Sequence, residues 1–537
     1  MVQQLNQQGV AMAAALAAGG GQNMLDRVIA YVAPQYAVQR LAARGALALS
    51  GGYTGARLDR AALSRYAPRA GGPASDIARD LPMLRARSRD QVRNAPVATG
   101  AVGSTVSHVV GTGLSFSPAI DAIRLGLDED QAAEWQSDTQ RKFGAWAISP
   151  DCATSRNLNF YGLQELAFRS ALESGDVFAT TPMPVRAGRR RLALQLIEAD
   201  RVCNPHGAVN TDLLQDGVEL AAETGEAMYV HIARRHPGDP AGIANAWDRM
   251  AVRGPSGRRN VIHLYKALRP GQVRGVPWLA PIIEPLKQLQ RYSDAELQAA
   301  VVSGLFAVFI KMDPTAFGDL FDDDAQGVLA DKAGKWSGEM EAGQVVNLLP
   351  GEEAMPVNPG RPNAQFDPFV QAILRQIGMA LELPYEVLVM HFQSSYSAAR
   401  GALLMAWKLF RSRRDWVATY FCQPVYETWL AHEVAEGRIA APGFFADESV
   451  RAAWSLGTWV GDGPGSIDPT KEVAAAWDRV EMGISTLAAE SVLHDGVEWE
   501  IKQRQRRREV DRQRRDGTFV SNKAASQVST DLLDGIK

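Results

Sequence analysis

Apolar residues recur at helical spacing in several segments of the chain. Residues 131 to 147 and 161 to 172 place apolar side chains on one face at a period near 3.6, which predicts amphipathic helices. The segment from Pro281 to Ser303 has the same pattern, and its two prolines fit only at a helix entry or first turn. A further helix is expected with Asp367 as its N-cap and Pro368 as its first residue.

Between these helices the pattern changes to short alternating or apolar runs. From about residue 176 to 268, runs such as RLALQLIEADRV and EAMYVHIARR are separated by NPHG, HPGDP and RGPSG, which is typical of strands and turns. Two more strands are expected at residues 305 to 311 and 344 to 350, on either side of an acidic insert. The sequence therefore predicts an α+β fold in which helices flank a β-rich unit.

The longest helical pattern follows a short loop without Lys, Arg, Asp or Glu. From Leu403 to Phe421 apolar residues recur in steps of four and three, with Arg414 in one of the places. Pro424 falls inside the pattern, so a kink is expected near residue 420. A loop held between helices can project a few side chains rigidly into open space. Its residues are His391, Phe392, Gln393, Ser394, Ser395 and Tyr396.

Two helices are expected near the C-terminus. Asp468 followed by Pro469 predicts the start of the first, and Asp495 with Glu498 has the spacing of a capping box for the second. The second helix carries the densest basic run of the chain. Its arginines are Arg504, Arg506, Arg507, Arg508, Arg512, Arg514 and Arg515. Acidic residues interleave with them, which favours a solvated face with ion pairs over a nucleic-acid contact.

Composition excludes several classes of protein. The 537 residues are 46% hydrophobic and 22% charged, as in ordinary globular proteins, and the net charge of -3 argues against a whole-surface grip on nucleic acid. Cys152, Cys203 and Cys422 form no CxxC pair, so we expect buried thiols instead of disulfides or a zinc site. No apolar run is long enough for a membrane span. Residues 1 to 23, rich in Gln and Gly, are expected to form a disordered leader.

Motifs of catalysis are incomplete. The Gly-rich residues 99 to 113 lack the lysine and hydroxyl of a phosphate-binding loop. HEVAE has Glu436 where a zinc protease has its second histidine, so we interpret His432 as a surface residue near a helix end. An acidic cluster lacks the glycine and final glutamate of an EF-hand, which indicates a solvated loop or a docking surface. Its members are Asp319, Asp322, Asp323 and Asp324. We expect no enzymatic activity, no cofactor and no metal.

Four passages of the sequence resemble the lambda-like branch of bacteriophage portal proteins. They are residues 261–283 (VIHLYKALRPGQVRGVPWLAPII), 382–389 (ELPYEVLV), 394–430 (SSYSAARGALLMAWKLFRSRRDWVATYFCQPVYETWL) and 467–487 (IDPTKEVAAAWDRVEMGISTL). The similarity extends from about Met24 to about Arg515. The resemblance implies a homo-oligomeric ring, a dodecamer in assembled particles, at one capsid vertex of the virion. The ring would assemble in the host cytoplasm and pass double-stranded DNA during packaging and ejection.

The resemblance also implies a division of the chain and a set of partners. The parts would be a wing (24–280 and 397–466), two stem helices (281–304 and 366–383), a clip (305–365), a tunnel loop (384–396) and a crown with a C-terminal tail (467–537). The loop from His391 to Tyr396 would face DNA, the acidic cluster would lie in the clip, and Arg504 to Arg512 would offer a basic crown contact. Expected partners are the terminase large subunit, head-completion or adaptor proteins, and major capsid and scaffold proteins; no membrane contact is expected.

Two alternatives stay open from the sequence alone. One is an enzyme of phage head maturation or DNA processing, and the other is a monomeric DNA-binding protein that uses the Arg-rich C-terminal helix. A conduit has to contact DNA without holding it, because many persistent phosphate contacts bring strong binding. A loop without charged side chains meets that requirement.

Overall fold

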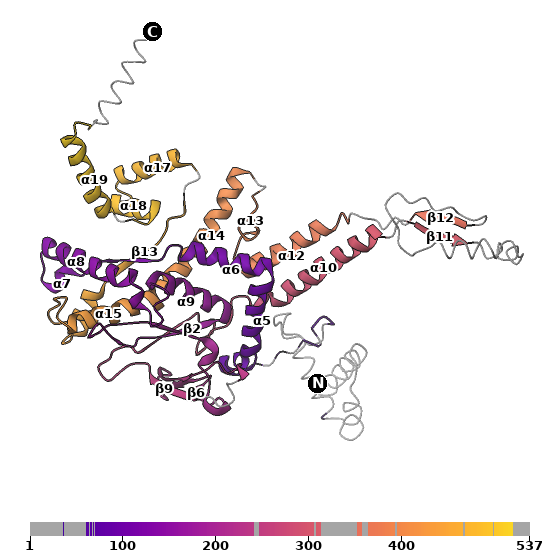
Figure 1. Cartoon of the computed structure of the whole chain (residues 1–537), viewed down its shortest axis with the longest axis horizontal. Coiled ribbons are helices and arrows are strands. Elements are labelled where there is room, and N and C mark those ends of the chain that lie inside the picture. Colours follow the sequence, from indigo (N-terminus) through magenta and orange to yellow (C-terminus); the bar gives the residue numbers. More distant parts are fainter. Residues whose placement is uncertain are drawn as a thin grey trace, which may run out of the picture. The chain divides into compact units, whose positions relative to one another are not determined.

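The structure is a computed structural model, and its elements are shown in Figure 1. It describes Tyr36 and residues 61–63, 65–66, 68, 70–240, 246–305, 308–312, 352–356, 363–392, 395–465, 468–497 and 499–518. The chain divides into two units, Met1–Gly71 and Gly72–Lys537, and every element below belongs to the second. The expected leader at residues 1 to 23 and the expected strand at 344 to 350 lie outside the described residues.

Helices α8 (Glu129–Ile148) and α9 (Phe160–Ser174) confirm the two helices predicted near the N-terminal side of the β-rich unit. Each begins at a side-chain cap: α8 has a capping box at Asp128, and the side-chain oxygen of Asn159 accepts the Gly162 N–H at the start of α9. The apolar pattern at 161 to 172 places Leu163, Leu166 and Ala167 on one face; Leu163 and Ala167 are buried as expected, but Leu166 is 41% exposed. Leu166 lies at the edge of the buried face, because Phe160 and Phe168 extend that face on the other side.

Two antiparallel sheets confirm the β-rich unit. The first has the order β10-β2-β5, with β10 (Val261–Tyr265), β2 (Asp176–Thr180) and β5 (Gln195–Glu198). The second runs β6-β7-β8-β9, with β6 (Leu214–Gln215), β7 (Val218–Leu220), β8 (Ala227–Ala233) and β9 (Trp247–Ala251). Every residue of the central strand β2 is buried, since strands cover both its edges and α9 contacts it.

The long helical pattern forms one nearly continuous run. It comprises α14 (Tyr396–Val417), the π-helical segment η8 (Ala418–Cys422) and α15 (Gln423–Ala435). At the place where a kink was predicted, near residue 420, the structure has a π turn, and Pro424 follows it as the second residue of α15. Tyr426 and Trp429 of α15 pack with Phe143 of α8 in an aromatic cluster. This aromatic cluster anchors the long helical run in the core.

Helices α10 (Ile283–Leu305) and α12 (Phe366–Ala380) lie side by side (Figure 1). The predicted N-cap of α12 at Asp367 is wrong. The helix begins two residues earlier, with Gln365 as its cap residue and Phe366 as its first residue, because Phe366 stacks on Tyr292 of α10 with ring centroids 5.4 Å apart. Between the two helices in the sequence, β11 (Val308–Met312) pairs antiparallel with β12 (Glu352–Pro356).

The last described elements are α17 (Pro469–Glu481), α18 (Leu487–Asp495) and α19 (Trp499–Arg515), called here the C-terminal helices. Asp468 caps α17 as predicted, since its carboxylate accepts the Lys471 N–H. The predicted cap role of Asp495 is wrong, because this residue ends α18 and Gly496 closes that helix in the left-handed conformation. None of the three helices contains a buried residue.

The remaining elements complete the unit. They are α4 (Pro73–Ile77), α5 (Leu81–Asn94), α6 (Pro96–Val109), β1 (Ser115–Pro118), α7 (Ala122–Leu125), β3 (Val185–Arg186), β4 (Arg189–Arg190), α13 (Tyr385–Leu388), α16 (Glu448–Ser455) and β13 (Gly457–Val460). β1 pairs with β13, which joins the N-terminal helices to the segment before the C-terminal helices. Among the described residues, no helix has both the length and the apolar character that a membrane span requires.

Candidate nucleic-acid interface

The candidate loop begins on a packed base. Helix α13 (Tyr385–Leu388) precedes it, and the last two residues of that helix are buried. The His391 N–H donates to the Glu386 carbonyl at 3.0 Å, and Met390 adopts a φ of +53° that turns the chain away from the helix. Because the backbone is fixed at this point, the direction in which the loop leaves the core is fixed as well.

The other end of the loop is the start of α14. The Ser395 hydroxyl accepts the Ala398 N–H at 3.4 Å, so Ser395 is the N-cap. The first turn contains no acidic residue, and its unpaired N–H groups lie at the positive end of a 22-residue helix. A helix start of this kind favours an anion such as a phosphate. Gln393 and Ser394 lie outside the described residues.

The described part of the loop is solvent-exposed. His391 and Ser395 are exposed, and Phe392 and Tyr396 are 46% and 52% exposed. Met390, just before the loop, is 64% exposed. The loop therefore offers a hydroxyl, an imidazole and aromatic faces, with more apolar surface than its sequence first indicated.

The predicted basic cluster lies on α19, away from the elements that hold the loop. The arginines Arg504, Arg506, Arg507, Arg508 and Arg512 are all exposed on α19. The Arg504 guanidinium donates to the Ser137 hydroxyl of α8 at 3.2 Å. The loop, in contrast, rests on α13, so the structure does not join the two predicted groups into one site. The acidic cluster Asp319, Asp322, Asp323 and Asp324 lies outside the described residues, and its docking role stays a prediction.

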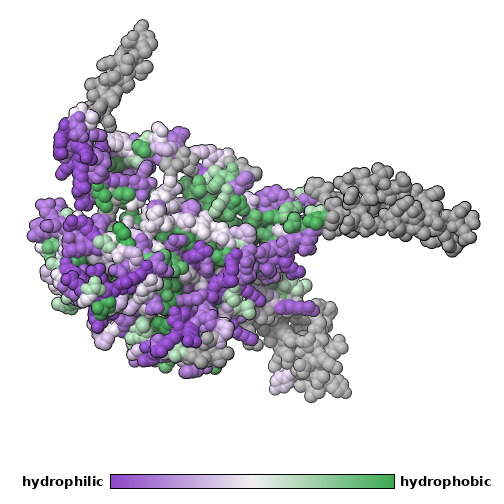
Figure 2. All heavy atoms as spheres, in the orientation of Figure 1, coloured by the Kyte–Doolittle hydropathy of each residue, from purple (hydrophilic) through white to green (hydrophobic). Residues whose placement is uncertain are grey.

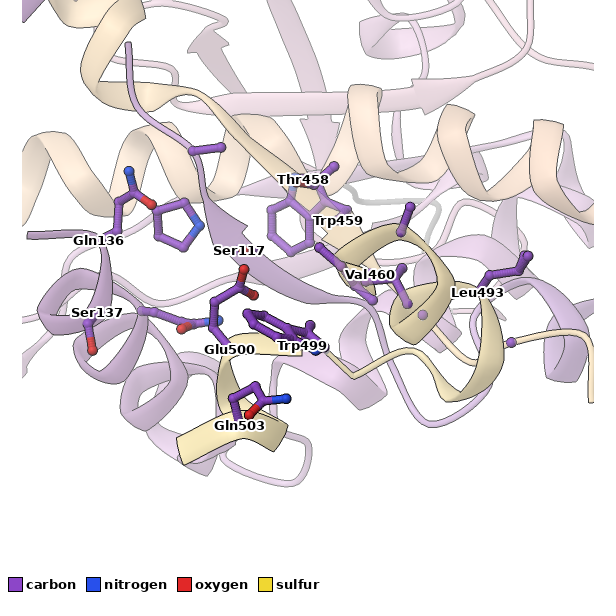
Figure 3. A pocket seen from close by; sticks show the side chains of 18 of the residues that line it. Ser117, Gln136, Ser137, Thr458, Trp459, Val460, Leu493, Trp499, Glu500 and Gln503 are labelled. Atoms are coloured by element: carbon purple, nitrogen blue, oxygen red, sulfur yellow. The ribbon is translucent and has the colours of Figure 1, made fainter. Parts of the chain in front are cut away.

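A groove of about 1330 Å³ separates the C-terminal helices from the rest of the unit (Figure 3). Trp499 and Leu493 line it from the C-terminal helices, and Ser117, Trp459 and Gln136 line it from β1, β13 and α8. Trp499 and Trp459 give it apolar surface. Charged side chains line the groove as well, among them Glu500 and Arg504 of α19 and Arg411 of α14.

Sequence reasoning did not single out a buried ion cluster around Asp176, which is fully buried in β2. Arg274 and Arg85 donate to its carboxylate at 2.6 and 2.9 Å, and His263 lies 3.2 Å away. Burial alone would raise the pKa of Asp176, but the two guanidinium groups hold that pKa well below its usual range. We call these four residues the ion cluster. It ties α5, β2, β10 and the loop at residue 274 together, which is a structural role.

Among the residues that the structure describes, one group of side chains has spacing suited to a metal ion, and the sequence analysis did not predict it. Ligand atoms of Glu198, Asp200 and His236 lie within 4.8 Å of one another. The Arg89 guanidinium bridges them, however, since it pairs with Glu198 at 3.0 Å and also with Asp200. A cation is therefore already in place, and the group is an ion-pair network.

The interpretation of His432 as a surface residue is wrong. It does lie in the last turn of α15, as expected, but its side chain is buried. One ring nitrogen lies 3.2 Å from the Arg190 carbonyl oxygen. The short β3–β4 hairpin covers this helix end, a contact between segments that the local sequence does not reveal.

Comparison with known proteins decides the family. The family described as phage portal protein, lambda family, matches residues 60–414. The chain belongs to this family. It is similar to the portal protein of Escherichia phage N15, 26% identical over 446 residues that cover 80% of this chain and 84% of the relative. It is also similar to portal protein B of Escherichia phage lambda, 24% identical over 424 residues, with 75% and 79% of the two chains covered.

Solved structures give a weaker likeness. The neck of a native gene transfer agent particle, computed with C12 symmetry, has a TM-score of 0.40 at 14% identity, covering 70% of this chain and 94% of that one. The virion of the native particle has a TM-score of 0.38, also at 14% identity, with 72% and 96% covered.

Membership confirms the resemblance seen in the sequence. As a lambda-family portal protein the chain forms the connector and DNA channel of the capsid, at the portal vertex of the virion. Its role is structural and not enzymatic, which confirms that prediction. The family match ends at Arg414, so it does not extend to the C-terminal helices.

Proposed function

We propose that the loop from His391 to Tyr396 is the tunnel loop of the ring and contacts double-stranded DNA in the channel. The observation that carries the proposal is an exposed loop without charged side chains, held between a packed base at α13 and the start of α14. Hydroxyl, aromatic and backbone N–H groups contact phosphates and sugars without the counterion release that accompanies each Lys or Arg contact. Such contacts guide DNA and let it move.

The parts of the ring follow the division implied by the family. The wing is residues 24–280 and 397–466, the stem helices are 281–304 and 366–383, the clip is 305–365, the tunnel loop is 384–396, and the crown with its tail is 467–537. The paired helices α10 and α12, with β11 and β12 between them in the sequence, support the assignment of stem and clip. The absence of buried residues in α17, α18 and α19 supports a separate crown.

The partners follow from the same proposal. Twelve copies of the chain form the ring, and the terminase large subunit docks on the clip before head-completion or adaptor proteins replace it. Major capsid and scaffold proteins surround the ring during assembly. The acidic cluster at Asp319 to Asp324 is proposed as part of the clip docking surface. The exposed arginines of α19 are proposed as a basic crown contact.

The loop is tested by exchanging residues 393 to 396 for Gly and Ser in assembled particles and measuring packaged DNA. We expect normal rings and a loss of packaging. As a matched control, the same exchange is made in the exposed turn at residues 222 to 225, where packaging should remain at the parental level. Unchanged packaging in the loop variant would show that the loop makes no functional contact.

A deletion separates the conduit from the alternative of a monomeric DNA-binding protein. Removal of the residues after Trp499 takes away the basic helix α19. On the conduit proposal the rings persist, because the channel loop lies elsewhere. If the protein were a monomeric DNA-binding protein that uses α19, DNA association would disappear with the helix.

A further inference from the structure

Helix α17 presents an apolar stripe that nothing in the described chain covers. Val473 and Trp477 are one turn apart and 57% and 65% exposed. Glu472 and Glu481 flank the stripe on its two sides, given the 100° that separates successive helical residues. Within the described part of the chain, neither glutamate forms an ion pair. An exposed tryptophan stripe with an acidic border is typical of a contact surface.

The first half of α14 presents a second uncovered face. This helix buries Ala406, Leu409 and Phe410 on one side only. On the opposite side Leu404 is 57% exposed, and Arg400 and Lys408 are exposed one turn before and one turn after it. Figure 2 shows hydrophobic surface in this part of the molecule. The face therefore has an apolar centre and a basic border.

The two faces complement each other in the arrangement of their apolar residues and in the sign of the charges around them. Each has an apolar centre about one helical turn long, and the acidic border of α17 matches the basic border of α14. Within the single chain, Asp468 and Lys471 at the start of α17 interact electrostatically with Arg400, but Val473, Trp477 and Leu404 stay exposed, so the apolar centres do not cover each other there. A ring needs two different patches on each subunit that fit together from one copy to the next.

We propose that α17 of one copy packs against the first half of α14 of the neighbouring copy in the ring. Val473 and Trp477 then cover Leu404 and the neighbouring Met405, which is 68% exposed, and the flanking glutamates of α17 face Arg400 and Lys408. This inference rests on the ring of the proposed function and names the surfaces that close it. The pairing also supplies the C-terminal helices with the buried contacts that they lack within one chain. DNA is a poor occupant of the α17 face, because Glu472 and Glu481 repel phosphates.

Site-directed cross-linking between two kinds of subunit tests the pairing. Both chains carry Cys203→Ser, because Cys152 and Cys422 are buried and Cys203 is only partly so. One chain carries Leu404→Cys and the other Trp477→Cys, and the two are assembled together and treated with a short bis-maleimide. We expect covalent dimers from the mixture and monomers from either chain alone. Leu404→Cys mixed with Ile123→Cys, a 95% exposed position on α7, is the matched control and should give monomers.

A single chain with both cysteines decides between the pairing of neighbours and a contact inside one subunit. The pairing of neighbours predicts a ladder of covalent oligomers. An internally linked monomer as the main product would overturn the proposal, and so would rings that give no cross-link. In both of these cases the channel function would stand. If the parental chain formed no rings, the proposed function would fail together with the pairing.

Charge reversal gives a measurement that does not depend on the cysteines. Glu472→Lys with Glu481→Lys should lower the fraction of chain found in rings several-fold, as should Arg400→Glu with Lys408→Glu. The chain with all four substitutions should recover rings, because the opposite charges face each other again. Loss without recovery, or no loss at all, would contradict the pairing.

Discussion

The ion cluster at Asp176 and the C-terminal helices differ in where their charged groups find partners and in how deeply they are buried. In the first, every charge is buried and has its partners within the chain, at distances of 2.6 to 3.2 Å. In the second, the Arg479–Glu490 pair is tight at 2.6 Å but is not buried, and no helix buries a residue. The comparison teaches that the ion cluster is complete within a single chain, whereas the C-terminal helices are left with exposed apolar surface, which the proposed pairing between copies would cover.

The largest effect is expected from Asp176→Asn. The substitution removes the carboxylate that Arg85 and Arg274 share and leaves Arg85 only the more distant Asp200, 3.9 Å away, which should lower the free energy of unfolding by about 3–5 kcal/mol. Glu490→Gln is the matched control, and it should leave the denaturation midpoint close to that of the parent, because solvent screens that pair. Chemical denaturation measures both. Equal losses in the two variants would break the comparison.

Acid should act on the ion cluster in a defined direction. The pKa of Asp176 in the folded chain lies well below the ordinary value of 3.8, so the unfolded chain binds a proton that the folded chain does not. Its stabilising effect is full above about pH 4 and is lost as the pH falls below that, by at most about 1.4 kcal/mol per pH unit. Denaturation midpoints measured from pH 5 to pH 2 should fall less steeply in Asp176→Asn than in the parent. Parallel slopes would mean that this carboxyl is not ionised in the fold.

A smaller and local effect is expected where the two regions join. The Thr112 N–H and hydroxyl each donate to the Asp462 carboxylate at 3.1 Å, just before the C-terminal helices. Asp462→Ala should speed protease cleavage and hydrogen exchange at residues 461 to 465 while the β-rich unit keeps its protection. Asp138→Ala, which removes an exposed pair on α8, should leave that exchange unchanged. Faster exchange in β2 as well would show that the regions are coupled.

The smallest effect is expected in the reactivity of the three thiols, and it involves no change in the stability of the fold. Burial raises the pKa of Cys152 to about 12 and that of Cys422 well above its ordinary value, so both are poor nucleophiles in the fold. Cys203 is only partly buried. Alkylation followed by mass spectrometry should therefore modify Cys203 first and the other two only after unfolding. Early modification of Cys152 would show that the N-terminal core opens more easily than its packing indicates.

The sequence predicted those elements whose signal is local. The period of α8 and α9 and the Asp-Pro entry of α17 were sufficient, because a cap and an apolar stripe lie within a few residues of each other. The cap at Asp495 was predicted wrongly, since Gly496 ends the preceding helix at that place. The start of α12 was displaced by a contact with α10, which is a tertiary effect.

The site was predictable only in part, because only some of its residues carry a signal in their local sequence. The loop from His391 to Tyr396 stands out in the sequence because two helical patterns border it. The partners of Asp176 lie 91 and 98 residues away, so no spacing rule could join them. The contact role of the loop and the docking role of the acidic cluster stay predictions.

The π turn at Ala418–Cys422 has a consequence for how the long helical run tolerates insertions and deletions. A π turn holds one residue more than an α turn, so it offsets the faces of the two flanking helices by about 100°. Deletion of one residue there would restore a regular helix but rotate the aromatic face of α15 away from Phe143. The extra residue therefore sets the direction in which the side chains of α15 point relative to those of α14. The length of this segment is thus as strongly constrained as the identity of its side chains.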